Sequence, residues 1–322
     1  MPKFLKVILY PIAFVVSFAL FLGILFPYDS VKDRVAREIE GAFGGGYRIT
    51  IGSLLPIPMS GAMLRDVEIQ TRGDKEAAPI KISQAKLAIA LIPLLSGSTE
   101  VGFDIRTGQG RPAPSTSDGR DSPSPLISKG EGRAVGDFSW GRGEIGINAK
   151  LDKFDLALAS FLTQKSGLRV TGLVGGTIDL EIYPQDPLRN TGNINLQILD
   201  LSLGEVSFAD GALTIPALRL AQADGSRLDV AISRGNFEVK GMQLAGGDIS
   251  LDSNGKIYGA RSIDNYRFNL RGNLKVSQEV ADKLQILSLV EKQKTADGAY
   301  PFTITGRVTK PSIRIGEFKL PI

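Results

Sequence analysis

Residues 177–198 read TIDLEIYPQDPLRNTGNINLQI, and this stretch decides the fold. Apolar and polar residues alternate on both sides of a turn-like segment that contains two prolines and an aspartate. A period of two places successive side chains on opposite faces of a β-strand, so the stretch predicts an antiparallel hairpin with one apolar face. The candidate apolar face consists of Ile178, Leu180, Ile182, Ile194, Leu196 and Ile198.

The same alternation extends outward from this hairpin in both directions along the chain. It predicts further strands within 47–71, 81–95, 99–106, 145–151, 228–232, 237–239, 249–251, 266–274 and 302–304. Turn signals at Asp224-Gly225, Gly246-Gly247, Asn254-Gly255 and Gly272-Asn273 separate several of these runs. A change of parity after Ile198 predicts a β-bulge. The pattern therefore indicates a mainly β fold built on an antiparallel meander, with few short helices.

Three segments show helical spacing instead. In residues 30–43, Val31, Val35, Ile39 and Phe43 recur every four positions, which predicts an amphipathic helix. This helix could pack on its own domain or lie on a membrane surface, and the first interpretation is favoured. Further helices are predicted at 155–165 and 278–293.

An uncharged stretch of 20 residues lies near the N-terminus, at 7–26. A helix of about 20 apolar residues spans a bilayer core. A cleaved signal peptide would have a shorter apolar core and a small-residue cleavage site, which is absent here. Lys3 and Lys6 precede the stretch, so the positive-inside rule predicts a single-pass inner-membrane protein with a cytoplasmic N-terminus and a periplasmic bulk. The predicted membrane anchor comprises Val7, Ile8, Leu9, Ile12, Phe14, Val15, Phe18, Leu20, Phe21, Leu22, Ile24, Leu25 and Phe26.

A change of composition divides the rest of the chain. Fourteen of the 26 residues from 107 to 132 are Gly, Pro or Ser, which predicts a disordered linker. The predicted organisation is a cytoplasmic tip and anchor at 1–27, a helix and β lobe at 28–106, a linker at 107–133 and a main β domain at 134–322.

The composition excludes several classes of function. The chain has no histidine and no cysteine, so zinc fingers, cysteine nucleophiles and triads with histidine are ruled out. A net charge of +4 does not indicate a nucleic-acid binder. The glycines at 141, 143 and 146 match a dinucleotide-binding pattern, but a strand pattern follows them where that motif needs a helix. We therefore expect no enzyme activity, no cofactor and no metal.

The C-terminal stretch carries a recognisable set of turn and strand residues. It consists of Asp297, Gly298, Tyr300, Pro301, Phe302, Ile304, Gly306 and Pro311, and it resembles the end of the type II secretion system protein N family. The chain is also similar, more distantly, to AsmA-like envelope proteins. The resemblance implies an elongated, curved antiparallel sheet that forms a trough behind one transmembrane helix. It implies structural rather than catalytic roles for these residues.

Two functions follow as expectations. The first is a non-catalytic structural or assembly component of a type II secretion system, with other secretion subunits as partners. The alternative is an AsmA-like protein that binds or transfers membrane lipid through an apolar groove between inner and outer membranes. The apolar face could equally be a closed core, and the residues leave this open.

Overall fold

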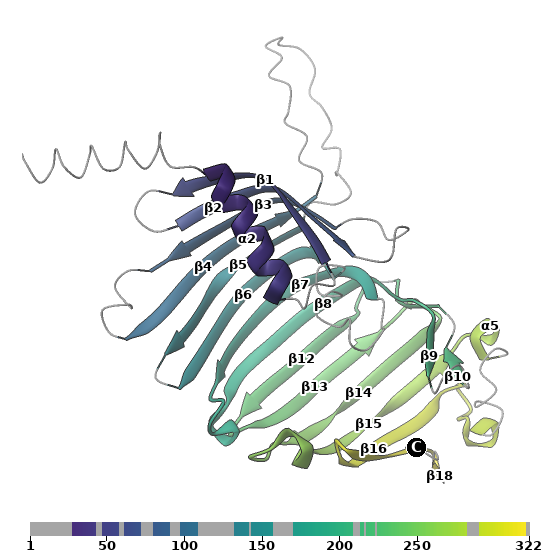
Figure 1. The fold of residues 1–322 in the computed structure, drawn as a ribbon. Helices are drawn as coiled ribbons and strands as arrows, with labels where there is room; N and C mark the ends of the chain where they lie inside the picture. Colours follow the sequence, from purple (N-terminus) through teal and green to yellow (C-terminus); the bar gives the residue numbers. More distant parts are fainter. Residues whose placement is uncertain are drawn as a thin grey trace, which may run out of the picture. The chain divides into compact units, whose positions relative to one another are not determined.

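The chain folds as a mainly β protein. The computed structural model describes residues 28–42, 47–57, 61–71, 80–90, 97–108, 132–141, 143–156, 170–208, 213–215, 217–222, 224–281 and 290–319. Sixteen strands form one antiparallel sheet, in which neighbours along the chain are mostly neighbours in space (Figure 1). The predicted antiparallel meander is therefore confirmed.

The elements have the following bounds. The sheet contains β1 (Tyr47–Ile57), β2 (Gly61–Thr71), β3 (Ile80–Ile89), β4 (Ser98–Thr107), β5 (Gly132–Gly141), β6 (Glu144–Asp155), β7 (Val170–Ile182), β8 (Thr191–Leu203), β11 (Leu218–Ala221), β12 (Arg227–Ser233), β13 (Asn236–Leu244), β14 (Ile249–Tyr258), β15 (Arg267–Val276), β16 (Tyr300–Arg307), β17 (Lys310–Ile315) and β18 (Phe318–Lys319). A separate pair is formed by β9 (Val206–Phe208) and β10 (Leu213–Ile215). The described helices are α2 (Tyr28–Ala42), α5 (Gln278–Ala281) and the 3-10 turns η2 (Pro187–Arg189), η4 (Ile263–Asn265) and η5 (Glu291–Gln293).

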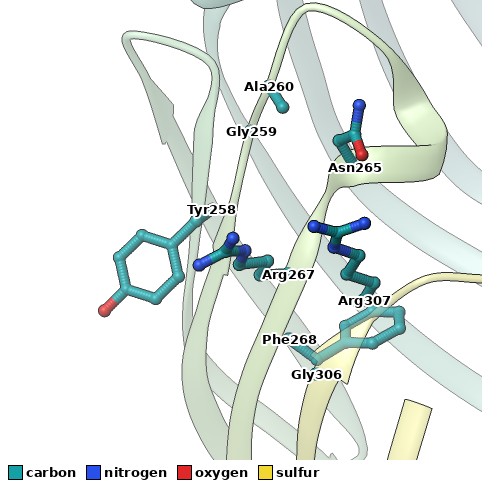
Figure 2. A pocket seen from close by; sticks show the side chains of 8 residues that line it. All are labelled: Tyr258, Gly259, Ala260, Asn265, Arg267, Phe268, Gly306 and Arg307. Carbon is teal, nitrogen blue, oxygen red and sulfur yellow. The ribbon is translucent and has the colours of Figure 1, made fainter. Parts of the chain in front are cut away.

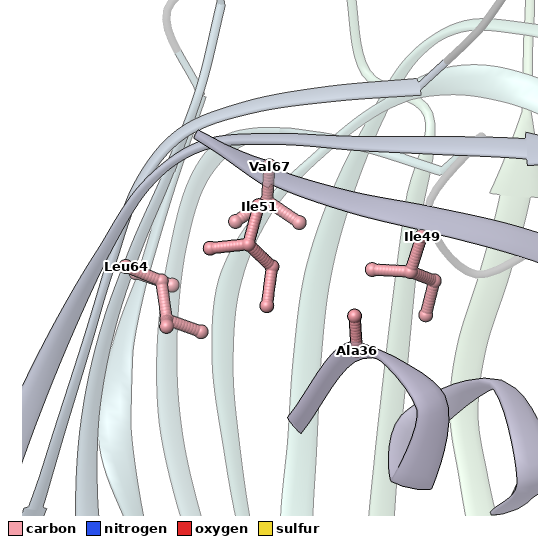
Figure 3. Close-up of a cluster of buried hydrophobic side chains, with 6 residues drawn as sticks. Ala36, Ile49, Ile51, Leu64 and Val67 are labelled. Carbon is pink, nitrogen blue, oxygen red and sulfur yellow. The ribbon is translucent and has the colours of Figure 1, made fainter. Parts of the chain in front are cut away.

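The chain divides into two compact units, residues 1–91 with 102–122, and residues 92–101 with 123–322. In the first unit, α2 packs on β1 through a cluster of buried apolar side chains (Figure 3). The cluster consists of Ala36, Ile49, Ile51, Leu64, Val67 and Ala85, and Val35 packs against it. The amide of Ile49 also donates a hydrogen bond of 2.7 Å to Glu40 Oε1. The predicted amphipathic helix is confirmed, and it covers the sheet of its own unit.

The second unit is organised by cross-strand register. The order β5-β6-β7-β8-β12-β13-β14-β15-β16-β17 keeps apolar residues opposite apolar residues from strand to strand. A bulge in β8, where Asp200 has φ 51°, absorbs the change of parity after Ile198, as predicted. A second shift lies between Val239 and Met242 of β13 and restores the alternation there.

Two predicted turns are wrong. Asn254-Gly255 lies within β14 and Gly272-Asn273 lies within β15. A Cβ atom at Gly255 would overlap the carbonyl oxygen of Asn269, and one at Gly272 would overlap that of Asp252. These glycines therefore serve close approach of neighbouring main chains within the sheet rather than reversal of the chain.

The boundaries of the predicted linker also need correction. Thr107 is the last residue of β4, and Gly132 and Arg133 are the first two residues of β5. Arg133 pairs with Asp152 in the ladder, so strand pairing begins inside the predicted linker, before residue 134. The rest of the linker, residues 109–131, lies outside the described residues.

The remaining helical predictions are tested only in part. Asp155 ends strand β6, and residues 157–169 lie outside the described residues. The predicted helix at 278–293 begins as α5 and ends as η5, with 282–289 undescribed. Among the described residues, no helix is long and apolar enough to cross a membrane. The predicted anchor at 7–26 lies outside them.

Candidate functional site

The candidate site is one side of the sheet in the second unit, which we call the apolar face. One row of this face crosses nine strands and consists of Ala149, Ile178, Ile194, Val230, Val239, Gly255, Leu270, Ile304 and Ile313. Neighbouring strands lie about 4.8 Å apart, so the row is about 38 Å long. Half of a bilayer core is about 15 Å thick, so the row is longer than an extended lipid acyl chain.

The six face residues singled out from the sequence lie together on this side. Ile178 pairs with Ile194, Ile182 pairs with Ile145 of β6, and Ile198 pairs with Val174. All six side chains are partly exposed. Between Thr177 and Glu181 of β7 and between Asn193 and Gln197 of β8, the other side carries exposed polar side chains, namely Thr177, Asp179, Glu181, Asn193, Asn195 and Gln197. The sheet is thus amphipathic across its thickness.

Two glycines on the apolar face allow close packing of its strands. Gly192 has φ 149° and lies opposite Leu180, whose Cδ2 covers the position that a Cβ atom would occupy. Gly255 has φ 140° and lies opposite Leu270. An L side chain at either position would be strained, so the face is kept bare at these points and covered from the neighbouring strand.

The C-terminal end of the apolar face is closed by its own cap. Val290, Tyr300 and Ile315 are buried there, and Leu274, Val276, Ala281, Phe302 and Phe318 pack against them. The helical part of this cap comes from the described residues of 278–293, which lie beside β15–β17. No described helix of the second unit packs on the face between β6 and β14.

Tyr300 fixes this cap. Its hydroxyl donates a hydrogen bond of 2.7 Å to Glu291 Oε2. Burial and this hydrogen bond raise the pKa of Tyr300 to about 12. The same bond, with one from Lys294, lowers the pKa of the Glu291 carboxyl.

The other residues of the C-terminal motif are also structural in position. Asp297 accepts a hydrogen bond from Thr295 and pairs with Lys275 at 3.3 Å, and these bonds lower the pKa of its carboxyl. Gly298 follows with φ 79° in the same turn. Pro301 and Phe302 lie in β16, and Gly306 pairs with Pro311 across the β16–β17 hairpin. The motif therefore builds the last hairpin and its cap.

A hollow of about 860 Å³ lies where β14, β15 and β16 end (Figure 2). Its lining includes Phe268 and Gly306, which continue the apolar face, and Arg267 and Arg307, which belong to the polar side. Arg267 and Arg307 are directly opposite each other in the ladder. Sequence reasoning missed this pair, because the two residues are far apart in the chain and only the strand register joins them.

The acidic side chains of the described residues do not gather into a candidate metal site. The described residues contain no group of three or more acidic side chains that could hold a metal ion. The predicted anchor residues lie outside the described part of the chain. Comparisons with models of protein families, with curated proteins and with solved structures found no match.

Proposed function

We propose that the protein binds acyl chains of membrane lipid on the apolar face of its second unit. The observation that carries this proposal is the row of apolar residues across nine strands, much of which stays partly exposed between β6 and β14. Covering such a face removes apolar surface from water, and each buried methylene contributes about 0.8 kcal/mol. An acyl chain needs no specific polar partner, which suits a face without charged side chains.

Trp140 offers a direct test, because it is the only tryptophan of the chain. It lies opposite Ile145, on the same side of the sheet as the apolar face, and is 43% exposed. A spin-labelled fatty acid bound on the face should quench its fluorescence, and an unlabelled fatty acid should shift its emission to shorter wavelength.

Matched variants separate the two sides of β7. Leu180→Asp places a charge on the apolar face, and Thr177→Asp places the same charge on the polar side. We expect the first to lose fatty-acid binding and the second to keep it, with circular dichroism checking that both fold. Should Leu180→Asp fail to fold, Leu196→Ser tests the same face. Equal binding by folded variants on both sides, or no binding by the wild type, would refute the proposal.

A role as a structural component of a type II secretion system is a second proposal. Strand β1 pairs only with β2 among the described strands, so its outer edge is available for a strand of another subunit. Anchoring in the inner membrane through residues 7–26 belongs to the same proposal. Co-purification of the full chain with secretion subunits tests it. The amides of Thr50 and Ser53 point to opposite edges of β1, so the single variants Thr50→Pro and Ser53→Pro are compared, and loss of the association in the variant that keeps the β1–β2 ladder would locate the contact.

A further inference from the structure

Every second connection between neighbouring strands lies at one end of the second unit. These connections are residues 141–144, 183–190, 234–235, 259–266 and 308–309, and the antiparallel order places them all at the same end of the sheet (Figure 1). We call this the turn end.

Exposed apolar side chains concentrate there. Of the described residues in the second unit, five large hydrophobic side chains are strongly exposed, and all five lie at the turn end. They are Trp140, Leu188, Tyr258, Ile263 and Val308. Ile263 is the most exposed at 69%, and it occupies the tip of the β14–β15 connection. Isolated exposed apolar residues are ordinary, but their confinement to one end marks a surface for an apolar partner.

The connections are held to one another by hydrogen bonds. The amide of Gly235 donates to Asn190 O at 3.0 Å, and the amide of Val308 donates to Tyr266 O at 2.9 Å. The amide of Gly259 donates to Asn236 Oδ1 at 3.1 Å. Neighbouring turns are therefore fixed relative to one another, so their exposed tips present a preformed row.

Basic residues surround these tips. Of the described residues, 143–144, 183–190, 233–236, 258–267 and 307–310 contain six basic side chains and three acidic ones. The basic ones are Arg189, Arg234, Arg261, Arg267, Arg307 and Lys310. At the opposite end of the strands, the described residues 132–133, 152–156, 170–172, 200–208, 217–222, 224–227, 244–249, 276–281, 290–300 and 315–319 contain ten acidic side chains and seven basic ones. In the described part of the second unit, the turn end is thus net positive and the opposite end net negative.

Two of these basic residues, Arg267 and Arg307, have no acidic partner among the described residues. Side chains directly opposite in an antiparallel pair have Cβ atoms about 5 Å apart, and like charges there repel. Neither guanidinium has an ion pair or hydrogen bond with any described residue. Figure 2 shows Arg307 extending toward Asn265 and Arg267 extending toward Tyr258, beside the hollow. A phosphate group placed here would satisfy both cations.

We propose that the turn end docks on an anionic lipid surface. Apolar tips enter the headgroup layer, the aromatic side chains lie at its boundary, and the arginines contact lipid phosphates. A nucleic acid would use the cations but not the apolar tips at Leu188, Ile263 and Val308. This inference goes beyond acyl-chain binding and does not depend on it, although it places the end of the apolar face at a membrane.

The absence of cysteine allows a site-specific test on the full chain. A bimane label on Ser262→Cys reports the turn end, and one on Ala296→Cys reports the opposite end; both positions are exposed. The probes are phosphatidylcholine vesicles with and without phosphatidylglycerol, some carrying brominated acyl chains. With phosphatidylglycerol present, the label at 262 should shift to shorter wavelength and be quenched by bromine, and the label at 296 should not.

Charge and apolar variants complete the test. Arg234→Gln, Arg261→Gln and Arg307→Gln combined should weaken vesicle binding by the turn end on the order of 100-fold. The matched control, Arg65→Gln, Arg227→Gln and Arg314→Gln combined, should leave it unchanged.

Ile263→Ser with Val308→Ser should abolish the bromine quenching. Equal response of both labels, no response at 262, or equal binding by the two arginine variants would overturn the proposal. Fatty-acid binding in solution, without vesicles, and its loss in Leu180→Asp form a separate readout, because Leu180 lies outside the turn end; either proposal can therefore fail alone.

Discussion

Tyr300 and Val290 are the largest fully buried side chains among the described residues. The phenolic hydroxyl of Tyr300 has one acceptor, Glu291, and the ring closes the apolar cap against Ile315. These contacts explain the structural role of the Tyr-Pro-Phe sequence in the C-terminal motif. Its tyrosine joins the cap and is the first residue of strand β16, which Pro301 and Phe302 continue.

The raised pKa of Tyr300 predicts a loss of stability at high pH. The folded-state pKa of about 12 lies above the ordinary value of 10.0, so the folded state holds this proton more tightly. The stabilisation is complete below pH 10 and is lost as the pH rises through about 12. Subtracting the ultraviolet titration of Tyr300→Phe from that of the wild type should leave one tyrosine that ionises near pH 12. A difference step near pH 10 would contradict the buried hydrogen bond.

The same substitution should destabilise the protein by about 0.5–1.5 kcal/mol, the net contribution of one hydrogen bond. Tyr258→Phe serves as the control, because Tyr258 is 44% exposed and should change stability by no more than about 0.5 kcal/mol. Urea unfolding measures both.

Gly255 gives a second prediction at this scale. An alanine there would place its Cβ atom on the carbonyl oxygen of Asn269 at a φ of 140°, and such strain costs about 1–3 kcal/mol. Gly241 in the neighbouring strand has nothing within 4 Å of its Cβ position. Gly241→Ala should therefore change stability by about 0.5 kcal/mol at most. Similar unfolding free energies for the two variants would contradict the prediction. They would mean that β14 and β15 can move apart at Gly255 and so accommodate the alanine side chain.

At the scale of elements, alternation in the sequence predicted most strands because one face of each is apolar. Ile178, Leu180 and Ile182 are a direct example. The failures at Asn254-Gly255 and Gly272-Asn273 share one cause. A glycine is needed both where a chain reverses and where two strands approach closely, and local sequence does not distinguish these uses.

The turn end could not be read from the sequence for a different reason. Leu188, Ile263 and Val308 are isolated apolar residues in polar segments, and Arg267 is 40 positions from Arg307. Only the antiparallel order brings them to one end of the sheet. The apolar face itself was visible in the sequence, but whether an element covers it depends on tertiary packing.

The packing of α2 on β1 can be tested by one substitution. Ala36 is 8% exposed and lies in the cluster with Ile49 and Ile51. Ala36→Asp would bury a polar group there, at a cost of about 1–3 kcal/mol, and should loosen the helix. Amide hydrogen exchange should then quicken in α2 and in β1. The control Glu38→Asp, at an exposed position of the same helix, should leave exchange near the wild-type rate. Unchanged exchange in both variants would mean that the helix is held mainly by other contacts, such as Glu40 to the Ile49 amide.

At the scale of the whole molecule, two kinds of apolar surface exist in one chain. In the first unit a helix covers the sheet, and Leu64 is 8% exposed within a closed cluster. In the second unit Leu180 lies on the apolar face and stays partly exposed. The proposed function requires that Leu64 is enclosed by other apolar side chains and that water reaches Leu180.

Leu64→Ala and Leu180→Ala remove the same atoms from the two surfaces. In the closed cluster the change leaves a cavity, and we expect a cost of about 2–5 kcal/mol. On the apolar face water already reaches the side chain, so the cost of Leu180→Ala should be less than half as large. Urea unfolding, resolved by hydrogen exchange within each unit, measures both. A fatty acid at the same excess should stabilise the wild type more than Leu180→Ala, because a ligand that binds only the folded state adds stability that grows with the logarithm of its affinity. If the two alanine variants cost the same and fatty acid changes neither, the apolar face is a dry core, and acyl-chain binding has to be abandoned.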